Sequence, residues 1–97
     1  MASKKEQEKM VEKFQGIVTI YRGKFTEMRI EKEEFPHNKC LHSSNRGLSH
    51  CYYLLDRIEG FLKKGDVEKG KHWIGFIQGA LFMEGLYTID QFKSHGE

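Results

Sequence analysis

The chain has few of the residues that interrupt or cross-link a fold, and it has no long hydrophobic run. Its 97 residues include one proline and two cysteines, Cys40 and Cys51. Two cysteines do not make the disulfide framework of a small secreted domain, so we expect reduced thiols. No apolar run reaches transmembrane length, and the first residues, MASKKEQEK, lack the apolar core of a signal peptide. These absences predict a cytoplasmic protein that does not enter membranes.

An excess of charge of one sign is also lacking. The chain carries 16 basic and 14 acidic residues, which gives a formal net charge of +2. A binder of duplex nucleic acid needs a clear basic excess, so we do not expect one, and the near-neutral charge also argues against a weak single-strand binder. The basic residues are unevenly placed, since residues 35–64 contain five of them against Asp56 and Glu59. We expect any anionic ligand to bind near this middle segment.

Sequence signatures of catalysis are absent as well. The chain has no P-loop, no GxGxxG, no HExxH and no nucleophile elbow. Cys51 follows His50 directly, but adjacent residues of a helix point in different directions. We therefore predict a protein that is not an enzyme. His37, Cys40 and His42 are types of residue that bind zinc, but their spacing departs from that of known zinc sites. We predict neither a metal nor another cofactor.

What the sequence does contain is helical periodicity. From Met10 to Met28, apolar residues recur at the spacing of one helix face, and Ser3 with Glu6 fits an N-terminal capping box. We predict one long helix over 4–32, bent or broken near Gly23. Phe35-Pro36 closes this helix, because proline disfavours helical geometry at the residue before it, and a loop over 33–44 follows.

Two further helices and a short last one are predicted after the loop. Ser44 or Asn45 caps a helix over 45–64, and Gly65 ends it. Asp66 caps the next helix at once, over 66–84, so the two form an antiparallel hairpin. Thr88 and Gln91 make a capping box for a short helix over 88–94. The fold class is therefore all-α: one domain over residues 1–97, built as a small helical bundle.

The helix expected over 66–84 is apolar nearly all round. Such a helix has to be covered on more than one side, which a three-helix chain can hardly do by itself. Gly75 and Gly79 stand four residues apart, a spacing that permits another helix to approach closely, although it is strong evidence only in membranes. The surplus apolar surface favours a homo-oligomer.

The helix expected over 45–64 has a polar stripe beside its apolar line. Arg46, His50, Tyr53 and Arg57 follow each other at positions i, i+4, i+7 and i+11. Arginine offers forked donors to a phosphate, and an aromatic ring can stack on a base. The stripe is a candidate site for an aromatic phosphate, although stripes of this sort are more commonly a solvated face, in which Arg57 would pair with a local acid.

Three residues of the following helix complete the candidate site. His72, Trp73 and Gln78 interrupt or flank its apolar face. A buried Gln78 needs hydrogen-bond partners, which a neighbouring backbone or a ligand edge can supply. Trp73 more commonly belongs to a core than to a stacking platform, and His72 more commonly lies at a surface or interface.

The motif Gly70-Lys-His-Trp-Ile-Gly-Phe-Ile-Gln-Gly-Ala-Leu, followed by Gly85-Leu-Tyr-Thr-Ile-Asp, resembles the C-terminus of small, mostly uncharacterised proteins of tailed bacteriophages. In those proteins a segment similar to Ser49-His-Cys-Tyr precedes the same ending. The resemblance covers roughly residues 42–93 and carries over no catalytic residue.

This resemblance implies a phage context, in which small accessory proteins commonly act by binding. The corresponding expectation is a phage accessory protein that sequesters a nucleotide-like signal of host immunity and so blocks anti-phage defence in the host cytoplasm. The ligand would bind to the stripe and to His72, Trp73 and Gln78. The alternative is a protein–protein inhibitor that occludes a host protein through an apolar helical face.

Overall fold

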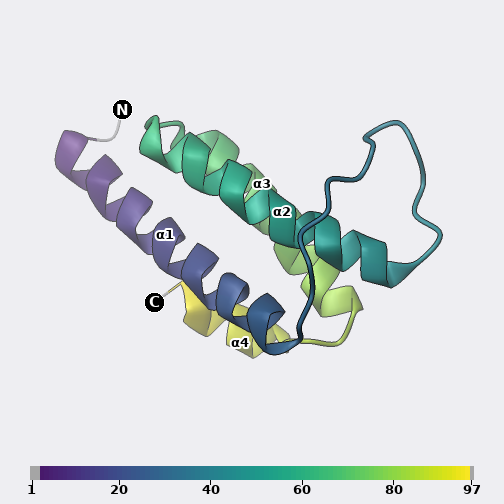
Figure 1. The fold of residues 1–97 in the computed structure, drawn as a ribbon. Helices are drawn as coiled ribbons and strands as arrows, with labels where there is room; N and C mark the ends of the chain where they lie inside the picture. The colour runs from purple at the N-terminus through teal and green to yellow at the C-terminus, as the bar shows by residue number, and fades with distance from the viewer. Residues whose placement is uncertain (1–2, 97) are drawn as a thin grey trace.

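Four helices form the protein in a computed structural model that describes residues 3–96. They are α1 (Lys4–Glu27), α2 (Ser44–Lys63), α3 (Val67–Met83) and α4 (Ile89–His95). Helices α1 and α2 lie side by side, α3 packs behind α2, and α4 lies below the C-terminal half of α1 (Figure 1). The predicted all-α bundle with its long N-terminal helix, antiparallel hairpin and short last helix is confirmed.

The helix caps follow the local sequence closely. The Ser3 hydroxyl accepts from the Glu6 backbone N–H at 3.2 Å, and the Asp66 carboxylate accepts from that of Lys69 at 3.2 Å. Thr88 forms the complete capping box with Gln91 at the start of α4. Gly65 has a φ of 83°, the left-handed conformation that glycine adopts without strain. The short connection at Gly65 lets α3 turn back directly along α2.

Two predicted helix ends were wrong. The first helix ends at Glu27 instead of residue 32, because Arg29 takes a left-handed φ of 59° and the Ile30 N–H bonds back to the Phe25 carbonyl at 3.0 Å. The predicted bend at Gly23 was also wrong, since α1 runs through it unbroken. Helix α2 is capped at Ser43, whose side chain makes no capping hydrogen bond, and not at Ser44 or Asn45.

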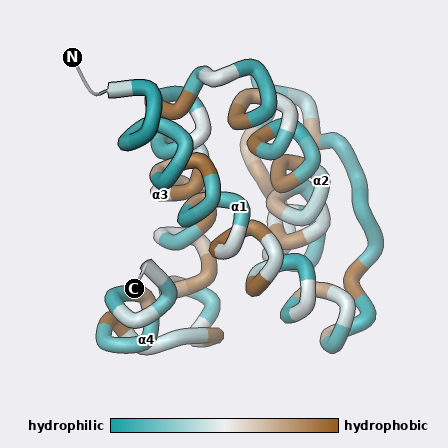
Figure 2. The backbone as a smooth tube through the Cα atoms, turned by 90° about the vertical axis from the view of Figure 1, so that its left-hand side faces the viewer, coloured by the Kyte–Doolittle hydropathy of each residue, from teal (hydrophilic) through white to brown (hydrophobic). Residues whose placement is uncertain are grey.

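The core lies between α1, α2 and α3. Hydrophobic and hydrophilic stretches alternate along each of these helices (Figure 2), as expected of helices that bury one face. The side chains that are essentially inaccessible to water are Val18, Tyr21, Phe25, Leu55, Ile58, Leu62, Ile77 and Leu81. No helix within residues 3–96 is long and apolar enough to cross a bilayer.

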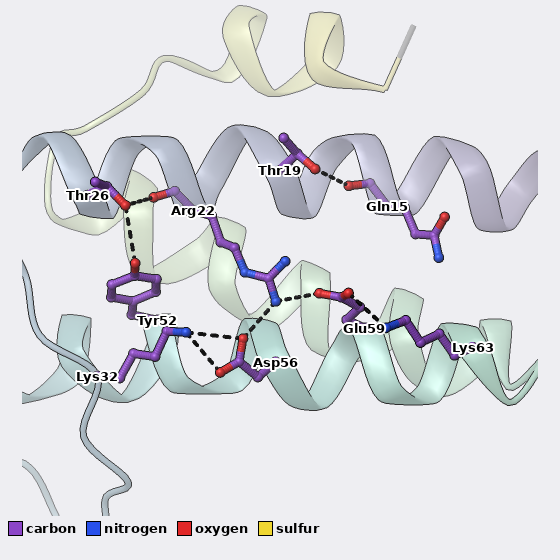
Figure 3. A network of polar contacts seen from close by, with 9 residues as sticks. All are labelled: Gln15, Thr19, Arg22, Thr26, Lys32, Tyr52, Asp56, Glu59 and Lys63. Carbon is purple, nitrogen blue, oxygen red and sulfur yellow. Dashed lines mark hydrogen bonds and ion pairs between the residues drawn. The ribbon is translucent and has the colours of Figure 1, made fainter.

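A polar network joins α1 to α2 beside this core (Figure 3). Arg22 of α1 reaches between Asp56, at 2.7 Å, and Glu59 of α2, and Lys32 also contacts Asp56 at 3.0 Å. Partial burial alone would raise the pKa of Asp56, but the hydrogen bonds from Arg22 and Lys32 outweigh it and lower that pKa. Because these groups are a third to a half exposed, each pair contributes only about 0.5 kcal/mol. The network fixes the register of the two helices more than it adds stability.

Helix α4 is held to the bundle by one buried tyrosine. The Tyr21 side chain is fully inaccessible, and its hydroxyl accepts from Gln78 Nε2 at 3.0 Å and lies 3.1 Å from His95 Nδ1. The rings of Tyr87, Phe92 and His95 surround it at centroid distances of 5.4–6.4 Å. Helix α4 itself contains no fully buried residue, so its contacts with the bundle run through Tyr21 and through the partly buried Phe92, which packs against the core.

Candidate ligand-binding groove

A groove of about 430 Å³ opens between the segment 35–41, α2 and α3. Its lining is mostly apolar and aromatic, with a few polar groups. The residues that line it are Phe35, Pro36, His37, Lys39, Leu41, Gly47, Leu48, His50, Cys51, Trp73, Phe76, Ala80, Met83 and Glu84. A concave apolar site of this size with few polar groups is typical of small-molecule binding sites.

The wall formed by residues 35–41 is attached firmly to α2. The Phe35 backbone N–H donates to His50 Nδ1 at 2.9 Å, and the Glu33 N–H donates to the Ser49 carbonyl at 3.1 Å. Arg46 pairs with Glu33 at 2.9 Å, and its guanidinium stands 4.9 Å from the centre of the Phe35 ring. These contacts fix the loop over the N-terminal half of α2, so the groove exists without a ligand.

His50 is the main polar group of the groove. Because Nδ1 accepts from the Phe35 N–H, the neutral ring carries its proton on Nε2. Burial, followed by the neighbouring His37, lowers the pKa of His50 and so favours this neutral form. The ring stacks on Tyr53 at 5.9 Å and meets His37 edge-on at 5.8 Å. His50 is thus a positioned hydrogen-bond donor between aromatic rings.

Cysteine and histidine are the reactive residue types in this region, with Cys51 directly after His50. Cys51 is buried in the groove wall, and burial raises the pKa of its thiol to about 11. A thiol of that pKa is protonated near neutral pH and is a poor nucleophile. Within residues 3–96, no three His, Cys, Asp or Glu side chains gather closely enough to hold a metal ion.

The seven predicted site residues do not form one site. His50 and Trp73 line the groove. Arg46 lies beside it and is occupied by Glu33, while Tyr53 supports His50 from behind through the ring stack. The Arg57 guanidinium is exposed and donates to the Tyr53 hydroxyl at 3.4 Å. The predicted stripe on α2 is therefore present, but of its four residues only His50 lines the groove.

The three residues of α3 divide between its faces. His72 is exposed and meets the Trp73 ring edge-on at 5.5 Å. Gln78 lies on the opposite side of α3 from the groove and donates to Tyr21. The hydrogen-bond partner of the Gln78 amide is thus a tyrosine hydroxyl. The sequence had suggested a neighbouring backbone or a ligand edge as the partner.

Sequence reasoning missed the loop side of the groove. Phe35, Pro36 and Leu41 are apolar residues in an otherwise polar loop, and that contrast was the one available signal. The predicted surplus of apolar surface on α3 includes Phe76 and Met83, and these two residues line the groove as well. A loop of this length has no periodicity, so its position over α2 could not be read from the sequence.

The outer face of α3 is unusually apolar. Phe76, Phe82 and Met83 remain 52%, 46% and 81% exposed. Between them, a Cβ atom added at Gly75 or Gly79 would meet no atom within 4 Å. The predicted surplus of apolar surface on this helix is therefore present in the single chain.

Comparisons with known proteins gave no match: no family model, no curated protein and no solved structure is significantly similar to this chain.

Proposed function

We propose that this chain is a non-enzymatic binding protein that sequesters a small aromatic anion, of the nucleotide-like class, in the groove between residues 35–41, α2 and α3. The observation that carries the proposal is the preformed groove itself. Its volume of about 430 Å³ lies in the usual range for small-molecule sites, roughly 300–1,000 Å³.

The chemistry of the lining supports this class of ligand. Trp73, Phe76 and Phe35 offer aromatic surfaces on which a planar base can stack, at about 1–3 kcal/mol per base. His50 contributes a hydrogen-bond donor, and Lys39 adds a positive charge among the lining residues. A ligand with an aromatic body can stack on these rings, and its anionic group would bind on the side of Lys39, because Glu84 of the lining carries a negative charge.

Sequestration is the proposed consequence of binding in the groove. A ligand held there is kept from its receptor for as long as it stays bound. The phage context rests on the sequence resemblance, and with it the proposed role is to remove a nucleotide-derived signal of host anti-phage defence. Under that proposal the protein acts in the host cytoplasm.

Calorimetry on the full chain with adenosine monophosphate and with a cyclic dinucleotide tests the site. Trp73→Leu and His50→Gln should each weaken binding about tenfold or more, because they remove a stacking surface and a donor. Arg57→Ala is the matched control, since Arg57 is a basic residue of α2 outside the groove lining. Equal affinity of Trp73→Leu and the wild type would show that the groove is not the binding site.

The exposed apolar face of α3 favours a second candidate, the protein–protein inhibitor. A host protein would then cover Phe76, Phe82 and Met83, which are too large and too exposed for an ordinary solvent face. This candidate predicts a stable complex recovered from host lysate that Phe82→Glu abolishes and Trp73→Leu reduces little. A complex insensitive to Phe82→Glu would exclude this face.

A further inference from the structure

We propose that residues 33–41, which we call the strap, are held on α2 by a hydrogen bond that protonation of His50 breaks, so that the groove opens in mild acid. The effect on a ligand rests on the proposed function, whereas the release of the strap does not. The observation behind the proposal is the acceptor of the Phe35 N–H. Most backbone N–H groups donate to carbonyls, which do not titrate, but this one donates to a histidine ring.

The strap is attached to α2 near its beginning. After α1 the chain runs along α2 before it turns outward to the start of that helix (Figure 1). Phe35 is buried, whereas residues 36–41 are exposed. The Glu33 N–H donates to the Ser49 carbonyl at 3.1 Å, and the Phe35 N–H donates to His50 Nδ1 at 2.9 Å. The exposed part of the strap therefore depends on a short stretch of contacts, one of which has a titratable acceptor.

Only the unprotonated Nδ1 of His50 can accept this hydrogen bond. A proton on that nitrogen uses its lone pair and turns the atom into a donor. The Phe35 N–H would then face another N–H, and a partly buried donor that loses its acceptor costs free energy. His50 can therefore become doubly protonated only when the Phe35 amide moves away from the ring.

The surroundings of His50 keep the ring neutral while the strap is closed. Burial lowers the pKa of His50 most, and His37, whose ring lies edge-on at 5.8 Å, lowers it further. The Glu33 carbonyl and the charge of Glu34 favour the protonated form, but they do not outweigh the first two causes. The closed strap is therefore retained at neutral pH, and its bond to His50 is lost only below about pH 6.5, the ordinary pKa of a histidine.

The other ionisable groups around His50 leave this direction unchanged. They are Lys39 of the strap, Arg46, Cys51, Tyr53 and Arg57 of α2, and Glu84 after α3. Lys39 and Glu84 carry opposite charges, and Arg46 is paired with Glu33 at 2.9 Å. Burial raises the pKa of the Cys51 thiol to about 11, so it stays neutral. Histidine is the side chain that ordinarily changes charge between about pH 7.5 and 5, and His50 is the histidine that bonds the strap.

Release of the strap removes one wall of the groove. The residues that line the groove from this side are Phe35, Pro36, His37, Lys39 and Leu41. Without them a ligand contacts α2 and α3 alone and loses the aromatic surface of Phe35 and the charge of Lys39. This consequence is opposite to that of simple electrostatics. Protonated histidines attract an anion, so a groove that stayed closed would bind an anionic ligand more tightly in acid.

Heteronuclear NMR of the full chain from about pH 7.5 to 5 tests the release of the strap. The Phe35 amide should shift and lose about tenfold or more of its hydrogen-exchange protection as the His50 ring titrates. In His50→Asn, whose side-chain carbonyl can accept the same bond without titrating, the amide should not respond. His72→Gln is the control, because His72 is exposed and does not line the groove. Unchanged protection through the His50 titration, or the same response in His50→Asn, overturns the proposal.

A second variant, His37→Gln, separates the two histidines of the groove. His50 remains in this variant, so the response of the Phe35 amide should also remain. A response that disappears in His37→Gln assigns the titration to His37 and overturns the proposal.

Calorimetry at about pH 7.5 and 5 separates the opening of the groove from the proposed function. A cyclic dinucleotide is the probe, because its phosphodiesters keep their charge, whereas a phosphate monoester titrates near about pH 6. The wild type should bind about tenfold more weakly at the lower pH, and His50→Asn should show no such loss. Equal or tighter binding by the wild type in acid refutes the opening of the groove. Binding at neither pH refutes this ligand and leaves the release of the strap, measured by NMR, intact.

Discussion

The hydroxyl of Tyr21 lies between Gln78 of α3 and His95 of α4 in a position closed to water. Tyr21→Phe leaves both partners without that bond, and we expect it to lower the free energy of unfolding by about 1–3 kcal/mol. Tyr52→Phe is the matched control, since it removes an exposed hydroxyl bonded only to Thr26 and should cost less than about 0.5 kcal/mol. Urea denaturation measures both, and equal losses would contradict the role of Tyr21.

Two histidines make stability depend on pH. Burial lowers the pKa values of His50 and His95 in the folded protein, whereas in the unfolded chain both titrate near about 6.5. Below about pH 6.5 the unfolded state binds more protons than the folded state. The free energy of unfolding that depends on these histidines is therefore fully present above about pH 6.5 and decreases as the pH drops below it. Urea denaturation at several pH values above 5 should show a smaller slope in His50→Gln with His95→Gln. An unchanged slope in the double variant would contradict this prediction.

At the scale of single residues, the sequence predicted which side chains make polar contacts more reliably than it predicted the partners of those side chains. Gln78 was recognised as an amide in an apolar helix that needs a partner, and it has one. That partner is Tyr21, 57 positions earlier, and no local pattern connects the two. His50 and Trp73 were named for their chemistry, and their meeting in one groove depends on how α2 and α3 pack.

At the scale of the helices, alanine substitutions at two glycines are expected to have opposite effects on stability. A Cβ at Gly70 would lie 2.8 Å from Leu62 Cδ2 and 3.2 Å from Leu62 Cγ, in the tight contact between α3 and α2. Gly70→Ala should therefore destabilise the protein by about 1–3 kcal/mol. Gly23→Ala should stabilise it by about 0.5–1 kcal/mol, because Gly23 lies in the middle of α1 with open space around it.

Thermal or urea denaturation of the two variants at the same low concentration decides this point. A stabilised Gly70→Ala would mean that α2 and α3 can separate slightly without cost. A destabilised Gly23→Ala would mean that α1 bends at this position after all.

The helices themselves were predictable, because caps and periodicity are local. Asp66 and Thr88 each cap the helix that follows, and the helix hairpin turns at Gly65 as its neighbours indicate. The end of α1 was not predictable, since Met28 and Ile30 continue the apolar spacing while Arg29 leaves the helix. Ile30 packs against the core from outside the helix, so periodicity alone could not distinguish the two cases.

At the scale of the whole molecule, the groove results from a loop that folds back over two helices. Its loop wall is fixed through Glu33, Phe35 and Arg46, and these contacts join residues 13 to 16 positions apart. The sequence placed the candidate site on α2 and α3 alone, because a polar loop gives no periodic signal. The apolar surplus of α3, by contrast, was predicted, since composition alone shows that one chain cannot cover it.

The most direct test of the binding groove is native mass spectrometry of the full chain with a panel of mononucleotides and cyclic dinucleotides. We predict a discrete added mass of one nucleotide ligand per chain, retained in Arg57→Ala and lost in Trp73→Leu. No added mass across the panel, or the same added mass in Trp73→Leu, would contradict a nucleotide-binding groove between α2 and α3.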